Sequence, residues 1–109
     1  MLCTMVTLDL IYGVMTNFYH QTFRLSKSHS PRITEKKQMF AVLARHYGHR
    51  VVDIRDYMGW RNHSSVCLAV RRMQGFIDVY PKVQREAMEL LERVDNAAGQ
   101  KYLEFDSAV

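Results

Sequence analysis

The segment GWRNHSSV, which runs from Gly59 to Val66, carries five polar side chains in a row before an apolar residue. The five are Arg61, Asn62, His63, Ser64 and Ser65. Each of these residue types can donate a hydrogen bond, and all except arginine can also accept one. The row stands at the start of a predicted helix, so free backbone N–H groups and the positive end of the helix dipole would lie beside it. This combination indicates contacts with the base edges and phosphates of a nucleic acid.

Two short helices joined by a tight turn are expected to position this polar row. Apolar residues three and four apart predict one helix from Val51 to Met58 and another from Ser64 to Gln74, with Gly59 ending the first. Such a pair describes a helix-turn-helix, whose second helix enters the major groove with its N-terminal residues on base edges. The polar row would then face the groove, and Val66 would begin the core.

Three more helices complete the prediction of an all-α fold, because no window of the sequence shows sustained alternation of apolar and polar residues. Helical periodicity predicts them from Leu8 to Tyr19, from Arg32 to Tyr47 and from Pro81 to Val94. Ser30 is a suitable N-cap for the second of these helices. Pro31 would follow at the first helical position, where its missing N–H costs nothing.

Length and composition predict one domain with a single core, since the chain has 109 residues of which 48% are hydrophobic. We assign the domain to residues 8–94, because residues 95–109 have no clear period and are expected to form a tail that frays. Cys3 and Cys67 lack C-x-x-C spacing, which favours a reduced intracellular compartment over a disulfide framework. The apolar start contains Asp9 and no basic n-region, so we expect neither a signal peptide nor a membrane span.

The net charge of +4 is concentrated in the middle of the chain. Residues 24–72 carry eleven basic and three acidic side chains, a net +8, whereas residues 1–23 carry −1 and residues 73–109 carry −3. A basic middle between neutral and acidic ends suggests a folded surface that faces a polyanion. The alternative is a solvated face of scattered Arg and Lys side chains.

Two stretches of the chain resemble the C-terminal DNA-binding domain of the bacterial chromosomal replication initiator DnaA. They are KQMFAVLAR, residues 37–45, and VVDIRDYMGWRNHSSVCLAVRRM, residues 51–73. The family's pattern in the second stretch is roughly G-G-R-D-H-[ST]-T-V-x-x-A-x-[RK]-[RK]-[IM]. The residues that match it in order are Gly59, Arg61, His63, Ser64, Val66, Ala69, Arg71, Arg72 and Met73. With the flanking helices, the resemblance covers about residues 8–94.

The resemblance implies a small multi-helix domain of the Trp-repressor-like class, with double-stranded DNA as its partner and a cytoplasmic, nucleoid-associated location in bacteria. The polar row from Arg61 to Ser65 would contact base edges in the major groove. Contacts with the DNA backbone or minor groove would come from Lys27, Arg32, Lys37, Arg45, Arg71 and Arg72. The biological role would be regulation of replication initiation or of transcription.

The chain departs from the family at several positions. Asn62 replaces an aspartate, and since Asp accepts from cytosine N4 whereas Asn can pair with adenine, the base preference does not carry over. Trp60 replaces the second glycine, and we expect it to cover the turn as a hydrophobic plug. Of the family's basic loop only Lys27 and Arg32 remain. The chain has neither a G-x-x-x-x-G-K-[ST] loop nor room for an ATPase domain, which excludes ATP-driven origin melting by this chain alone and predicts no nucleotide cofactor.

Several of these residues also have simpler structural explanations. Asn62 could act as a helix N-cap alone, and Arg71 and Arg72 could form ion pairs. His46 and His49 form an H-x-x-H pair without an evident third ligand, so we predict no metal site. Cys67 is expected to be a small apolar filler.

The sequence leaves alternative functions open, although no catalytic triad or carboxylate pair can be argued and we predict that the chain is not an enzyme. One alternative is a protein-interaction adaptor that keeps the fold without specific DNA binding. Its partner would be basic and would contact the acidic last helix through Glu86, Glu89 and Glu92. Another is nonspecific nucleic-acid binding through phosphate contacts alone.

Overall fold

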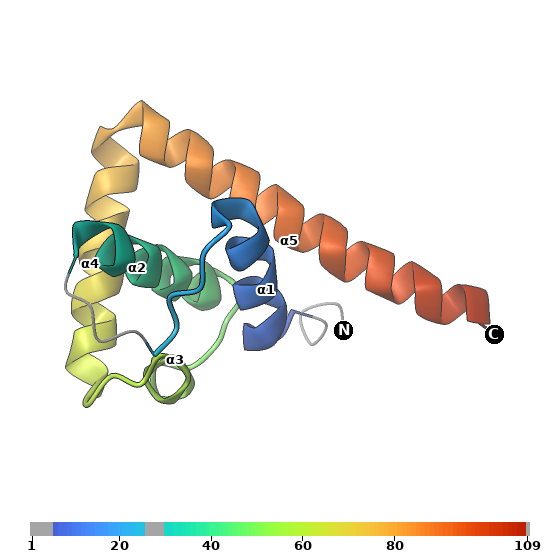
Figure 1. Cartoon of the computed structure of the whole chain (residues 1–109), viewed down its shortest axis with the longest axis horizontal. Coiled ribbons are helices and arrows are strands. Elements are labelled where there is room, and N and C mark those ends of the chain that lie inside the picture. The colour runs from blue at the N-terminus through green and yellow to red at the C-terminus, as the bar shows by residue number, and fades with distance from the viewer. Residues whose placement is uncertain (1–5, 26–29, 109) are drawn as a thin grey trace.

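The computed structural model describes residues 6–25 and 30–108, with side chains described through Gly99, and within these residues it contains helices and no strand. The helices are α1 (Leu8–Tyr19), α2 (Pro31–His46), α3 (Val51–Met58), α4 (His63–Val79) and α5 (Pro81–Ala108) (Figure 1). The prediction of an all-α fold is therefore confirmed. Ser30 caps α2 as predicted, since its hydroxyl accepts a hydrogen bond from the Ile33 N–H, and Pro31 opens the helix.

Helix α2 lies at the centre of the molecule and packs against each of the other four helices. Its most extensive contact is with α4, which crosses it (Figure 1). The buried residues of α2 are Ile33, Gln38, Met39, Phe40, Ala41, Leu43 and Ala44. The four consecutive buried residues from Gln38 to Ala41 cover more than one face of a helix, as expected of a helix enclosed by neighbours.

An aromatic cluster ties the segment after α1 to α3. The Tyr12 hydroxyl accepts hydrogen bonds from the backbone N–H groups of Phe23 and Arg24, each at 3.1 Å. Arg24 Nε donates to the carbonyl of Tyr57 at 2.7 Å, and the Arg24 guanidinium lies 4.2 Å from the centre of the Tyr57 ring. The Tyr57 ring stacks on Phe40 of α2, with ring centres 5.5 Å apart. A loop without secondary structure is thus held by hydrogen bonds to α1 and α3.

Two helices extend beyond their predicted ends. Helix α4 was expected to stop at Gln74 but continues to Val79, and it ends only where Pro81 forces Tyr80 into an extended conformation. Helix α5 was expected to stop at Val94 but continues to Ala108. No proline interrupts it, and its buried stripe includes Val94 and reaches Ala98, which is 9% exposed. Both predicted ends were therefore too early, and residues 95–108 are helical.

Three tyrosine hydroxyls donate to carboxylates on other helices. The pairs are Tyr19 with Glu86 at 2.9 Å, Tyr47 with Asp95 at 2.6 Å, and Tyr57 with Asp9 at 2.6 Å. They connect α1 to α5, the C-terminal end of α2 to α5, and α3 to the first turn of α1. Burial raises the pKa of all three tyrosines above the ordinary value, and the neighbouring carboxylates raise it further.

Gly59 provides the first test of this architecture. Its φ of +76° is left-handed, and a Cβ there would lie 2.8 Å from Leu25 Cδ2. Gly59→Ala should therefore destabilise the protein by about 1–2 kcal/mol, most of it from the backbone conformation. Gly75→Ala is the matched control, because Gly75 is helical with open space around it, and it should stabilise by about 0.5–1 kcal/mol. Urea denaturation measures the change in the free energy of unfolding for both variants. Equal changes would contradict the left-handed conformation assigned to Gly59.

The tyrosine pairs predict a loss of stability in alkaline solution. The folded protein retains tyrosine protons that the unfolded chain releases as the pH rises through about 10, so the free energy of unfolding should fall above that pH. Tyr19→Phe removes one such group and should be less stable at neutral pH but decline less steeply. Urea denaturation from pH 8 to 11 tests this prediction. If the free energy of unfolding falls equally with pH in both proteins, Tyr19 does not contribute to the alkaline loss of stability.

Candidate nucleic-acid interface

A short turn links α3 to α4 and presents the polar row. Gly59 ends α3 in the left-handed conformation, with its N–H directed at the Asp56 carbonyl. The Trp60 N–H donates to the Arg55 carbonyl at 3.0 Å, and the half-buried Trp60 side chain packs against the core. Trp60 thus covers the turn, as the sequence predicted. The chain then reaches Asn62, which starts α4.

Asn62 is the N-cap of α4, and its side-chain oxygen is fully engaged. Asn62 Oδ1 accepts from the Ser65 N–H at 3.2 Å, from the Ser64 hydroxyl at 2.6 Å and from the Ser65 hydroxyl at 3.2 Å. Bidentate pairing with adenine would need this same oxygen as an acceptor. The Asn62 amide nitrogen has no partner among the described residues, so in this arrangement the side chain offers a DNA base or phosphate donors only.

Arg61 and His63 flank the cap and are free to bind a ligand. Both side chains are exposed, and neither forms a hydrogen bond or ion pair with any described residue. From residue 57 to residue 77 the chain contains no Asp or Glu, so no carboxylate in this stretch competes for the two side chains. Arg61, the Asn62 amide and His63 therefore place exposed donors without protein partners among the described residues at a helix N-terminus, where negative charge is favoured.

Arg71 and Arg72 lie farther along the exposed side of α4. The buried side of the helix is formed by Val66, Ala69 and Met73. At 1.5 Å per residue, the two arginines stand about 12–14 Å from His63 along the helix axis. Neither has a partner among the described residues, so the alternative of an ion pair finds no support there. That spacing suits contacts with DNA phosphates beside the groove rather than with the same bases.

The other predicted cations are distributed over the molecule. Arg45 donates from Nη1 to the His49 carbonyl at 2.8 Å, and it shares an open depression of about 560 Å³ with Arg71. Lys37 is half-buried, and burial lowers its pKa. Arg32 lies toward the other end of α4, in a pocket with Tyr80, so it is not brought together with the polar row. Lys27 lies outside the described residues.

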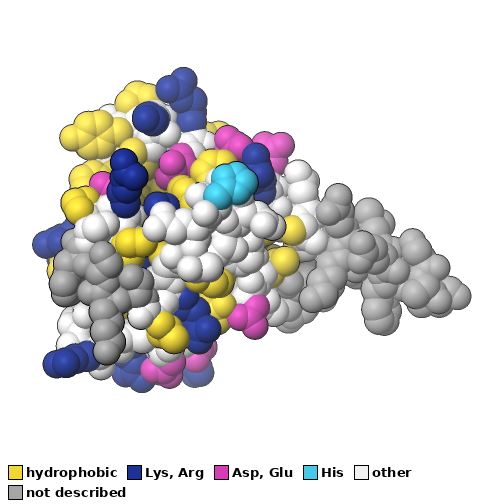
Figure 2. Space-filling view, in the orientation of Figure 1, with side chains coloured by type: hydrophobic (Ala, Val, Ile, Leu, Met, Phe, Trp, Pro, Cys, Tyr) yellow, Lys and Arg dark blue, Asp and Glu magenta, His cyan; other side chains and the backbone are white. Residues whose placement is uncertain are grey.

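Part of the positive charge of the described residues is paired or engaged within the protein. Among the described residues, Arg50 and Arg55 pair with neighbouring aspartates, at 3.1 and 3.0 Å, and Arg24 is engaged by Tyr57. Figure 2 shows Lys and Arg side chains at separate places around the visible face, with Asp and Glu side chains among them at its lower edge. On α4, by contrast, Arg61 before the helix and Arg71 and Arg72 along it have no partner among the described residues.

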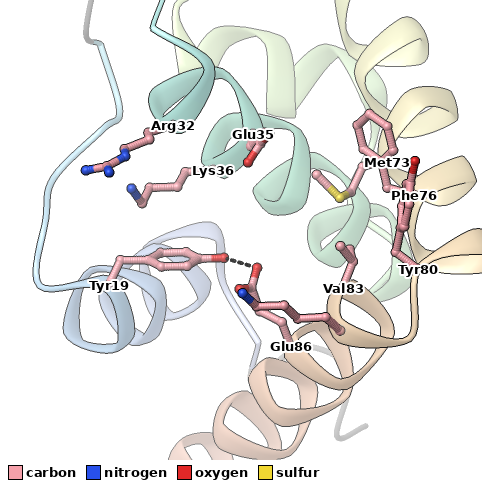
Figure 3. A pocket seen from close by; sticks show the side chains of 10 residues that line it. Tyr19, Arg32, Glu35, Lys36, Met73, Phe76, Tyr80, Val83 and Glu86 are labelled. Carbon is pink, nitrogen blue, oxygen red and sulfur yellow. Dashed lines mark hydrogen bonds between the residues drawn. The ribbon is translucent and has the colours of Figure 1, made fainter.

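Sequence reasoning missed a pocket of about 430 Å³ between the end of α1, the start of α2 and the corner between α4 and α5 (Figure 3). Phe76 and Tyr80 form part of its wall. Both lie between Gln74 and Pro81, outside the helices that the sequence predicts. The signal that could have indicated the pocket was the presence of two aromatic residues, Phe76 and Tyr80, between the two predicted helices.

The remaining predicted side chains have structural roles or face solvent. His49 Nε2 donates to the Val6 carbonyl at 2.7 Å, and the His46 ring packs on Tyr47. In the described part of the chain, no group of three His, Cys, Asp or Glu side chains could hold a metal ion. The prediction that Cys67 fills apolar space was wrong: it is exposed, because it lies beside the buried stripe of α4 rather than on it.

Comparison with known proteins assigns neither a family nor a function to this chain. No model of a known protein family matches this chain, and no curated protein matches it. Among the described residues, no helix has the length and apolar character needed to cross a membrane. Support for a function therefore comes from the arrangement of the side chains at the start of α4.

The cap at Asn62 can be tested without DNA. Asn62→Ala removes three hydrogen bonds and should destabilise the protein by about 1 kcal/mol, whereas Asn62→Asp keeps an acceptor at the same place and should change stability little. Asn96→Ala, at an exposed position inside α5, is the control and should be neutral or slightly stabilising. Urea denaturation distinguishes these outcomes. An unchanged midpoint for Asn62→Ala would show that the Asn62 cap does not stabilise the protein.

Proposed function

We propose that the chain binds double-stranded DNA, with the N-terminal turn of α4 in the major groove and α3 and α4 acting as a helix-turn-helix. The observation that carries the proposal is the cluster formed by Arg61, the Asn62 amide and His63. These donors are exposed and have no partners among the described residues, and they stand at a helix N-terminus in a stretch without carboxylates. A folded protein gains little from such a cluster in water, whereas base edges and phosphates satisfy it.

Each member of the cluster has a role in the proposed complex. Arg61 and His63 contact base edges or the nearest phosphates, and the Asn62 amide donates to an acceptor such as purine N7. Arg71 and Arg72 contact phosphates and hold α4 in register. Since the Asn62 oxygen is engaged by the two serines, the preferred site need not contain adenine at that position.

The resemblance to the DNA-binding domain of DnaA supports this orientation of α4, because the matching residues include Arg61, His63, Arg71 and Arg72. The residues at the start of α4 could bind DNA by themselves, so the chain would act by occupying or marking initiator-like sites. We therefore propose a role as a regulator or accessory factor in replication or transcription.

The adaptor alternative receives less support from the acidic last helix. Glu86 accepts a hydrogen bond from Tyr19, and Glu89 pairs with Arg93 at 2.9 Å, so two of the three predicted carboxylates are engaged within the protein. Only Glu92 is exposed and without a partner among the described residues. A basic partner would therefore have to compete for most of this surface.

Fluorescence anisotropy tests the proposal with a labelled duplex that carries the DnaA recognition box and with a scrambled duplex of equal composition, at two salt concentrations. We expect tight, salt-sensitive binding that favours the box. His63→Ala should reduce the preference by roughly 5- to 100-fold, because a base contact is lost. Arg72→Gln should weaken binding to both duplexes alike and lower the salt slope by about 0.9, because one phosphate contact is lost.

Arg85→Gln is the matched control, since Arg85 is an exposed cation on α5, away from the α4 N-terminus, and it should leave binding nearly unchanged. Equal binding to both duplexes with no effect of His63→Ala would indicate phosphate contacts alone. Absence of binding to either duplex at low salt would refute DNA binding and favour the adaptor.

A further inference from the structure

The pocket shown in Figure 3 has one apolar wall and one charged wall. Met73, Phe76, Tyr80 and Val83 form the apolar wall at the corner between α4 and α5. Met73 is only 3% exposed, whereas Phe76 and Tyr80 are 38% and 54% exposed. Their ring centres lie 6.1 Å apart. An aromatic pair left this open beside a buried methionine offers a ligand ring apolar contact on several sides.

The charged wall contains two neighbouring cations of α2. Arg32 and Lys36 stand four residues apart on one side of the helix, and Figure 3 shows both side chains on the same side of the pocket. Arg32 has no partner among the described residues. Lys36 Nζ donates to the Gln21 side chain at 2.8 Å and lies 5.2 Å from the centre of the Tyr19 ring, and neither contact neutralises its charge. Like charges at this spacing destabilise a helix, and an anion between them would relieve the repulsion.

The pocket is lined by three cations, Arg32, Lys36 and Lys82, and by two carboxylates, so their formal charges sum to 3 − 2 = +1. Glu86 lines it and accepts a hydrogen bond from the Tyr19 hydroxyl, and Glu35 lines it without an ion pair to either cation. A doubly charged phosphate group would exceed this net charge of +1 and would stand near both carboxylates. A carboxylate carries a single negative charge, and its two oxygens match the fork of an arginine side chain.

We propose that this pocket binds a small aromatic carboxylate, with the carboxylate group at Arg32 and Lys36 and the ring against Met73, Phe76 and Val83. The pocket volume of about 430 Å³ lies within the range of small-molecule sites and exceeds the size of a single aromatic ring with a short acid chain. The site is separate from the polar row at the start of α4. The proposal does not rest on DNA binding.

Binding can be measured by titrating the ¹⁵N-labelled protein with 3-phenylpropionate and following backbone amide shifts by NMR at neutral pH. The neutral isostere 3-phenylpropanamide keeps the ring and the chain but lacks the charge, so it should bind at least about tenfold more weakly. Butyrate keeps the charge but lacks the ring and should also bind more weakly. The shifts produced by 3-phenylpropionate should be concentrated at residues that line the pocket.

Two variants assign the contacts. Arg32→Gln should weaken binding of the acid by about tenfold while leaving the amide unaffected, and Phe76→Ala should weaken both compounds. Arg85→Gln retains the pocket and should bind like the unaltered protein. Circular dichroism confirms that each variant is folded. The proposal is wrong if the acid produces no saturable shifts, if the amide binds as tightly as the acid, or if Arg32→Gln binds the acid normally.

Discussion

The enclosure of α2 is the constraint on which the rest of the structure depends. Its residues from Gln38 to Ala44 are buried or half-buried on several sides, so every other helix must present an apolar face to it. Helix α4 meets this requirement with Val66, Ala69 and Met73, and most residues at both of its ends are exposed. One end carries the polar row, and the other forms the apolar wall of the pocket. The two proposed sites thus share a helix whose position α2 determines.

Local chemistry made the beginnings of helices predictable. Ser30 with Pro31, and Asn62 before α4, are recognised because capping needs only a short polar side chain and three residues of backbone. The left-handed end of α3 was equally clear from Gly59. The ends of α4 and α5 were not predictable in this way, because packing against the core continues along α4 to Ile77 and along α5 to Ala98. Such packing depends on contacts with distant segments, which periodicity within one window does not report.

The candidate site also combines features that the local sequence predicts with features that depend on tertiary contacts. Arg61, His63 and the cap at Asn62 follow from their neighbours in sequence, and the structure places them at one helix end. Which cations are already engaged depends on tertiary contacts: Arg45 reaches a carbonyl across the turn after α2, and Arg32 lies toward the opposite end of α4 from the polar row. A count of charges along the chain therefore identified a basic region but not its geometry. The pocket depends on four helices at once and had no counterpart in the sequence.

The helices of the fold are joined by hydrogen bonds from Tyr19, Tyr47 and Tyr57 to carboxylates, whereas the proposed binding of DNA depends on attraction between opposite charges. Each bond joins a neutral phenol to an anion, whereas the ion pairs among the described residues join positions at most four apart in the chain. Dissolved ions weaken attraction between opposite charges far more than they weaken buried apolar contacts and hydrogen bonds. A rise in ionic strength would thus release the protein from a polyanion while its helices stayed assembled, so that release and rebinding would require no refolding.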